Sequence, residues 1–213
     1  MMMGSELRGW WVTKIMKPIE DICIRMDIHP NTITMIGFTF NVLVGLLYVN
    51  GRFLWGGWLL IFAASFDFLD GRIARMTGKV SATGGYLDSI LDRYIDIILF
   101  GGLATYYRDT FVYYFAIGAI LGTFMVSYTK AKAESMGIKC DVGLMQRPER
   151  IVMLGLGSIV SSIFQIALMP FCEAPYNPPQ YLLILIIMVM AVLTNLTALH
   201  RIHFTWEKLR DAK

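Results

Sequence analysis

Apolar runs about as long as a bilayer is thick dominate this sequence. Two are plain, from Ile151 to Phe171 and from Tyr181 to Leu199, and two more, from Thr34 to Tyr48 and from Thr110 to Tyr128, are nearly as clear. A helix needs about 20 residues to cross a hydrocarbon core about 30 Å thick. Hydrophobic residues make up 56% of the chain and charged residues only 16%, which excludes both a disordered chain and a water-soluble domain. We therefore expect an all-α integral membrane protein.

Two further apolar runs, Phe53–Phe66 and Ile97–Tyr107, are too short to cross a bilayer alone. Each run adjoins aspartates at one end, which are Asp67 and Asp70 after the first run and Asp88, Asp92 and Asp96 before the second. Each run becomes a full span only if its aspartates lie inside one edge of the membrane. On that condition the sequence predicts six transmembrane helices.

Basic residues indicate the orientation of these helices. Of 19 Lys and Arg residues, only Arg52 and Arg108 fall in the loops after the first, third and fifth predicted spans. All the others lie at the two termini and near the loops after the second and fourth spans. By the positive-inside rule, both termini face the cytoplasm, as do the aspartate-bearing ends of the second and third spans. We expect a multi-pass protein of the cell membrane whose active site lies on the cytoplasmic face.

The segment before the first span mixes apolar and basic side chains. Residues 8–28 include Trp10, Trp11 and Lys14. Such a mixture is typical of an amphipathic helix that lies in the membrane interface, and a frayed tail is the alternative. We expect residues 1–30 to be an interfacial N-terminal segment of a single membrane domain that covers residues 1–213.

Two aspartate pairs lie on either side of one short loop. Asp67 and Asp70 are three residues apart, and Asp88 and Asp92 are four apart, which are the spacings that place side chains on one helical face. The loop is short enough to make the two helices antiparallel neighbours, so the pairs can face each other. Charges at helix ends that face water are the alternative, but ionisable groups inside apolar spans usually serve a function.

Four carboxylates so close together repel one another in a low dielectric, and this repulsion calls for a cation between them. Mg²⁺, or Mn²⁺, is a hard cation that prefers oxygen ligands of this kind. A pair of such ions can clamp both oxygens of a phosphoryl displacement. The spacing therefore points to a two-metal site.

The same stretch matches a known pattern at every specified position. The pattern is Asp, two residues, Asp-Gly, two residues, Ala-Arg, eight residues, Gly, three residues, Asp, three residues, Asp. The matching residues are Asp67, Asp70, Gly71, Ala74, Arg75, Gly84, Asp88 and Asp92. On this motif and the six-helix plan, the chain is identified as a member of the CDP-alcohol phosphotransferase family. The resemblance implies an enzyme of phospholipid synthesis that moves a phosphatidyl-type group from a CDP-linked lipid to an acceptor hydroxyl and releases CMP.

The resemblance also implies roles for single residues. The metal ligands are expected to be Asp67, Asp70, Asp88 and Asp92, which would hold two Mg²⁺ ions, with Mn²⁺ as the alternative ion. Asp92 is also expected to take the proton of the acceptor hydroxyl. The CDP part of the donor is expected to contact Asn31, Thr34, Gly71, Arg75 and Ser81.

Two further segments point to the acceptor. SYTKAKAESMGI (residues 127–138) and QRPERIV (residues 146–152) resemble the phosphatidylinositol phosphate synthases and their archaeal counterparts, which use inositol phosphate. This resemblance implies that the acceptor phosphate is bound by Lys130, by Arg147 or Arg150, and by Arg201. The ordinary basic fringe of a positive-inside membrane protein is the alternative explanation for these residues.

Other functions stay open at this point. With a different acceptor the chain would be a phosphatidylglycerophosphate synthase or another CDP-alcohol phosphotransferase. A divalent-cation transporter would carry acids deep in several spans rather than at one edge, and a catalytically inactive homologue would not keep the whole motif. We expect a CDP-linked lipid, a small phosphorylated polyol and membrane lipids as partners, and no nucleic acid. The family also suggests a homodimer.

Overall fold

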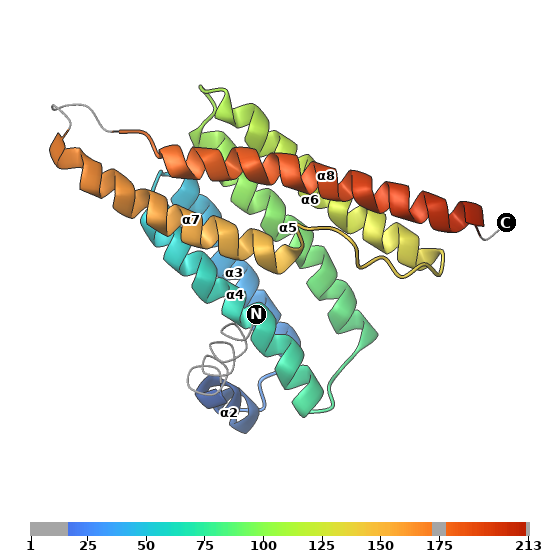
Figure 1. The fold of residues 1–213 in the computed structure, drawn as a ribbon. Coiled ribbons are helices and arrows are strands. Elements are labelled where there is room, and N and C mark those ends of the chain that lie inside the picture. Colours follow the sequence, from blue (N-terminus) through green and yellow to red (C-terminus); the bar gives the residue numbers. More distant parts are fainter. Residues whose placement is uncertain (1–16, 172–177, 212–213) are drawn as a thin grey trace, which may run out of the picture. The chain divides into compact units, whose positions relative to one another are not determined.

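A computed structural model describes residues 17–171 and 178–211 of the chain. Every regular element in this part of the chain is helical, which confirms the predicted all-α class (Figure 1). In chain order the elements are α2 (Lys17–Arg25), α3 (Pro30–Val49), α4 (Phe53–Met76), α5 (Ala82–Tyr106), α6 (Val112–Ser135), α7 (Arg147–Leu168), the 3-10 turn η2 (Met169–Phe171) and α8 (Tyr181–Asp211).

The two short apolar runs belong to long helices because each helix continues through its aspartates. α4 extends past Asp67 and Asp70 to Met76, and α5 begins at Ala82, before Asp88. Gly78 ends α4 with a φ of +66°, and the backbone N–H of Lys79 donates to the carbonyl of Ala74 (2.9 Å). A glycine in this left-handed conformation is a common helix end. The sequence was therefore sufficient to place the aspartates on two helices joined by one loop.

Five helices are long and apolar enough to cross a membrane. They are α3, α4, α6, α7 together with η2, and α8. α5 has 25 residues, enough at about 1.5 Å per residue to cross, but it carries several charged side chains in its first half. The structure thus supports a multi-pass arrangement, and the sixth span stays a prediction.

By backbone contacts the described residues divide into two compact units. Unit 1 combines residues 17–40 and 62–92, and unit 2 combines residues 41–61, 93–171 and 178–211. Of the predicted interfacial segment, residues 17–25 form α2 in unit 1, whereas residues 8–16 lie outside the described part of the chain. The prediction of one membrane domain is not tested by this division.

Unit 1 has a small apolar core on one side of α4. Ile33 of α3 and Leu69 and Ile73 of α4 are almost fully buried. Cys23 of α2 and Ile28 of the following turn pack against this core. α2, α3 and α4 are therefore held together by contacts on the side of α4 that carries Leu69 and Ile73.

Unit 2 contains a close contact between α6 and α8, which lie side by side (Figure 1). Gly118 and Gly122 are one turn apart on α6 and face Ala191, Thr194 and Asn195 of α8. The side-chain amide of Asn195 donates to the carbonyl of Gly118 (2.9 Å). Small residues with a polar bond between helices are the usual means of association in membranes, where lipid removes the hydrophobic driving force.

We predict that Gly122→Ala destabilises the protein because a methyl group at this position would lie 2.8 Å from the Thr194 Cβ and 2.7 Å from the Asn195 Nδ2. Overpacking of this kind costs about 1–3 kcal/mol. The measurement is the thermal unfolding midpoint of the detergent-purified protein. Gly118→Ala is the control, since its methyl group would meet Ala191 Cβ at an ordinary 3.8 Å. Equal midpoints for the two variants would contradict the close α6–α8 contact.

Candidate functional site

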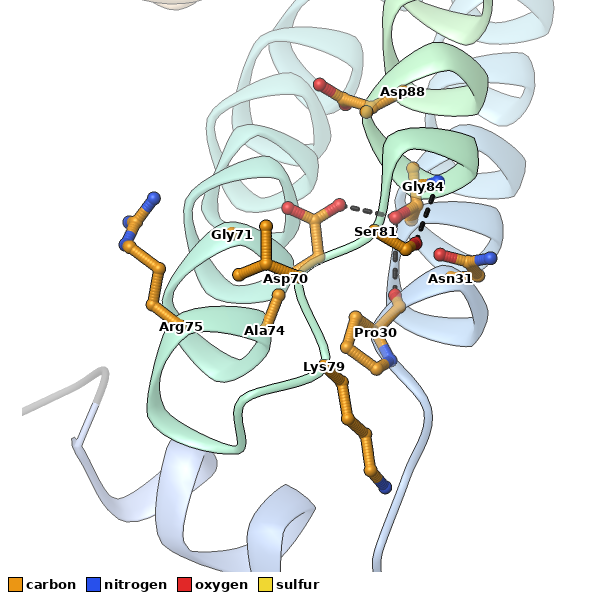
Figure 2. Close-up of a pocket in the computed structure, with 13 residues that line it drawn as sticks. Pro30, Asn31, Asp70, Gly71, Ala74, Arg75, Lys79, Ser81, Gly84 and Asp88 are labelled. Atoms are coloured by element: carbon orange, nitrogen blue, oxygen red, sulfur yellow. Dashed lines mark hydrogen bonds between the residues drawn. The ribbon is translucent and has the colours of Figure 1, made fainter.

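Unit 1 contains a pocket with a volume of about 270 Å³. Residues of α3, of α4, of the loop after α4 and of the start of α5 line it (Figure 2). They are Pro30, Asn31, Thr34, Asp70, Gly71, Ala74, Arg75, Lys79, Val80, Ser81, Gly84, Gly85 and Asp88. Every position of the sequence motif except Asp67 and Asp92 is among them.

Two helices begin at this pocket. α3 starts at Pro30, whose fixed φ and missing N–H suit the first position of a helix. α5 starts after Ser81, whose Oγ accepts a hydrogen bond from the backbone N–H of Gly84 (3.1 Å), as a helix-capping serine does. Helix N-termini present N–H donors and partial positive charge. This part of the pocket is therefore suited to an anionic group such as a phosphate.

Two carboxylates lie in the same pocket (Figure 2). Asp70 is buried, and its Oδ2 accepts a short hydrogen bond of 2.5 Å from Thr34 Oγ1. Asp67 and Asp88 are close enough to Asp70 to act on it electrostatically. Because like charges in a partly buried site repel, this arrangement favours a cation among the carboxylates.

Two of the four predicted metal ligands line the pocket. Asp70 and Asp88 line the pocket, whereas Asp67 and Asp92 do not. Among the described residues, no three acidic, histidine or cysteine side chains lie close enough together to hold a metal ion as they stand. The metal site therefore stays a prediction that rests on the motif and on the two pocket carboxylates.

The five residues predicted to contact the CDP part of the donor all line this one pocket. They are Asn31, Thr34, Gly71, Arg75 and Ser81. They come from α3, α4 and the loop after α4, so the structure brings together what the sequence separates by up to 50 residues. Sequence reasoning missed Pro30 and Lys79, although Lys79 lies in the motif's own loop and could have been considered there.

The cations predicted for the acceptor phosphate belong to unit 2. Lys130 Nζ lies 2.8 Å from Asp141 Oδ1 and 3.8 Å from Glu134 Oε1. Arg201 is buried, and it donates from Nε to the carbonyl of Val142 (2.8 Å) and from Nη1 to that of Val126 (2.7 Å). Each of these cations thus has a partner within unit 2.

Arginines also gather around a buried aspartate in unit 2. Arg150 Nη1 lies 3.1 Å from Asp96 Oδ2, and both side chains are more than nine-tenths buried. Arg147 and Arg93 are close enough to act electrostatically on Asp96 as well. Guanidinium groups are suited to phosphate, because their planar forks match its oxygens. Arg147 and Arg150 therefore lie in one basic region of unit 2.

Comparison with known sequences gives a consistent family. Residues 27–206 match the family model described as CDP-alcohol phosphatidyltransferase. The chain is similar to phosphatidylinositol phosphate synthase of Mycobacteroides abscessus, with 33% identity over 156 residues that cover 71% of each chain. It is equally similar to archaetidylinositol phosphate synthase of Methanothermobacter thermautotrophicus, with 33% identity over 193 residues that cover 90% of each chain.

Solved structures agree with these relatives. The fold is similar to that of Mycobacterium tuberculosis phosphatidylinositol phosphate synthase crystallised with CDP-DAG, with a TM-score of 0.78 and 29% identity. This match covers 91% of the present chain and 94% of the other. A second crystal structure of that enzyme, in complex with manganese and citrate, matches with a TM-score of 0.76 and 29% identity over 89% of this chain and 88% of the other.

We predict that Gly84→Ala weakens the binding of CDP about tenfold, equivalent to ~1.4 kcal/mol. The added methyl group would lie 3.0 Å from Ser81 Oγ and 3.1 Å from Asn31 Oδ1, so both pocket side chains would have to shift. The measurement is titration calorimetry of the purified protein with CDP. Gly101→Ala is the control, because it lies on the same helix with no heavy atom within 4 Å of the added methyl group. Unchanged affinity in Gly84→Ala would exclude this pocket as the nucleotide site.

Proposed function

Because this chain belongs to the CDP-alcohol phosphatidyltransferase family, we propose that it transfers a phosphatidyl-type group from a CDP-linked lipid to a hydroxyl of inositol phosphate. The acceptor oxygen bonds to the lipid-linked phosphorus, the bond from that phosphorus to the CMP oxygen breaks, and CMP leaves. The similarity to phosphatidylinositol phosphate and archaetidylinositol phosphate synthases supports this acceptor. Because one of these relatives is a bacterial and the other an archaeal enzyme, the lipid of the donor can be either a diacylglycerol or an archaeal ether lipid.

The chemistry of the unit 1 pocket is the observation that carries the proposal. Its two helix N-termini favour an anion, whereas Asp70 and Asp88 repel one. A diphosphate accompanied by divalent cations satisfies both preferences at once, because the cations neutralise the carboxylates and the diphosphate oxygens accept from N–H groups. A CDP-linked donor supplies that diphosphate.

We assign the metal ions to Asp67, Asp70, Asp88 and Asp92, and propose two Mg²⁺ ions, with Mn²⁺ as the alternative. The donor set fits, since all four ligands offer carboxylate oxygens and two of them line the pocket. The hydroxyl of Thr34 fixes the orientation of the Asp70 carboxylate. Bound divalent ions stabilise the charge on attacking and leaving oxygens in a phosphoryl displacement.

Asp92 is the base of the proposed reaction. It lies on α5 one turn after Asp88, and it is half-buried. A carboxylate can accept the proton of an acceptor hydroxyl that comes within hydrogen-bond reach. Asp92 therefore combines a place on the motif helix with the chemistry that the transfer requires.

The acceptor phosphate is bound, on this proposal, by Lys130, Arg147, Arg150 and Arg201. The basic region around Asp96 supports Arg147 and Arg150. The resemblance of two chain segments to inositol phosphate enzymes supports all four residues. Arginine binds phosphate through parallel hydrogen bonds, which also fix the direction of the acceptor. A hydroxyl can attack only from a defined direction, so this orientation serves the transfer.

The chain is a multi-pass membrane protein by its family and by its five long apolar helices. We propose that α5 is a sixth span and that α2 lies in the interface of the cell membrane. Both termini and the unit 1 pocket face the cytoplasm, where positive-inside loops belong. A homodimer is proposed from the family resemblance alone.

A panel of acceptors tests the function. Purified protein with CDP-diacylglycerol is expected to release CMP fastest with inositol phosphate and far more slowly with free inositol, since free inositol lacks the phosphate that the arginines bind. Glycerol phosphate and serine complete the panel. Preference for glycerol phosphate would keep the phosphate site and replace the acceptor. Preference for serine or free inositol would refute a phosphate site. No CMP release with any acceptor, from either CDP-diacylglycerol or its archaeal ether-lipid counterpart, would refute the reaction.

Metal removal tests the aspartate assignment. Chelation is expected to abolish CMP release, and added Mg²⁺ or Mn²⁺ is expected to restore it. Asp88→Asn should remove activity while the unfolding midpoint is retained, and Asp92→Asn should lower kcat by about 10²–10⁴-fold with donor binding retained. Asp109→Asn is the control, because Asp109 is exposed and pairs with its neighbour Arg108. Full activity in chelator would overturn the two-metal assignment.

A further inference from the structure

α2 is held to α4 by an ion pair between a buried carboxylate and a part-exposed guanidinium. The helix has only nine residues, and isolated helices below about 12–15 residues are marginal in water, so contacts within unit 1 must stabilise it. The carboxylate of Glu20 is 1% exposed and pairs with Arg72, whose Nη2 donates to Glu20 Oε2 (3.1 Å) and whose Nε contacts Oε1. The guanidinium of Arg72 also lies over the ring of Phe68, 5.5 Å from its centroid.

This ion pair acts on the helical turn that carries the motif. Asp70, Gly71, Ala74 and Arg75 of α4 line the pocket. Arg72 lies within the same turn but does not line the pocket; it contacts α2 instead. A rotation or shift of this turn would move the pocket residues and Arg72 together, because they share one rigid segment of helix.

A second ion pair ties the α2–α3 connection to the pocket loop. Asp27 adopts a left-handed backbone conformation with a φ of +49°, and its Oδ1 lies 2.5 Å from Lys79 Nζ. Lys79 belongs to the loop that lines the pocket, and Figure 2 shows its side chain directed away from Asp70. The hydrogen bond and charge of Lys79 lower the pKa of Asp27, so the Asp27 carboxylate is ionised at neutral pH. The pair is exposed and therefore weak, which makes Glu20–Arg72 the main contact.

We propose that α2 is a positioning element of the donor pocket and that Glu20 is its positioning residue, acting through Arg72 on the turn of α4 that contains Asp70 and Gly71. This inference rests on the proposed function, because it concerns the site of the CDP-linked donor. Removing Arg72 leaves the buried Glu20 carboxylate without its partner, and removing the charge of Glu20 leaves the guanidinium of Arg72 without its partner, so in both cases the turn of α4 loses its ionic contact with α2. The donor should then bind less well, whereas the acceptor cations of unit 2 are unaffected.

The test compares Glu20→Gln, Arg72→Gln and the double variant. Each single variant is expected to raise the donor KM roughly ten- to a hundredfold, because small displacements of positioning groups have effects of this size. The acceptor KM is expected to stay within about twofold. If both residues act through their pair, the double variant should be no worse than either single variant. Asp21→Asn is the matched control, since Asp21 is the exposed neighbour of Glu20 on α2.

Two further measurements distinguish a failure of the positioning role from a failure of the proposed function. Calorimetry with CDP compares nucleotide binding in the wild type and the variants without turnover, so a chain that binds CDP but releases no CMP would overturn the proposed function alone. Arg72→Lys keeps the charge but loses the two-pronged geometry, and an intermediate CDP affinity is expected from it. An unchanged donor KM and CDP affinity in Glu20→Gln would overturn the positioning role. A decrease in kcat alone in Glu20→Gln would also overturn it. The same holds if the double variant raises the donor KM by the product of the two single effects.

Discussion

Buried carboxylates must be paired, because an uncompensated charge in a low dielectric is very costly. The described residues show two kinds of partner. Asp96 and Glu20 pair with the guanidinium groups of Arg150 and Arg72, whereas Asp70 accepts a hydrogen bond from the neutral hydroxyl of Thr34. A guanidinium cancels the charge of its carboxylate, but a hydroxyl only orients it. Of these three carboxylates, Asp70 is the one that lines the pocket, where a negative charge is still able to attract a cation.

The close approach of helices in unit 2 follows from the lipid that surrounds a membrane protein. Lipid tails are as apolar as the side chains they touch, so helices associate through packing and polar bonds rather than through the hydrophobic effect. A methyl group added at Gly57 would lie 2.7 Å from the carbonyl of Gly155, and one added at Gly102 would lie 2.6 Å from that of Gly45. Such contacts exclude larger residues. They give unit 2 a rigid set of helices on which Asp96 and Arg150 can be buried together.

Local spacing made much of this molecule predictable from its sequence. The separations within 67–92 place the aspartates on two helices joined by one loop, and the motif indicates the residues that gather at the pocket. Ion pairs between residues far apart in the sequence, in contrast, leave no spacing pattern from which they could be predicted. Glu20 and Arg72 are 52 residues apart, and nothing in the periodicity of α2 or α4 indicates that they meet. The partners of Arg201 could not be predicted either, because they are backbone carbonyls, which every residue possesses.

The basic residues show why charge counting alone cannot separate a ligand site from a structural contact. A guanidinium has five N–H donors in a fixed fork, and an ammonium has three that rotate freely. Arg201 donates two N–H groups to the carbonyls of Val142 and Val126, which joins the loop before α7 to α6 and fixes the plane of its fork. Its full charge is retained, since carbonyls are neutral partners. Lys130 and Arg150, in contrast, pair with the carboxylates of Asp141 and Asp96, and each would have to exchange that partner for a phosphate. Arg201 and Asp70 are therefore alike, because each charged group is oriented by a neutral partner that does not cancel its charge. The charge of Arg201 is left for the proposed acceptor, and that of Asp70 for the proposed metals.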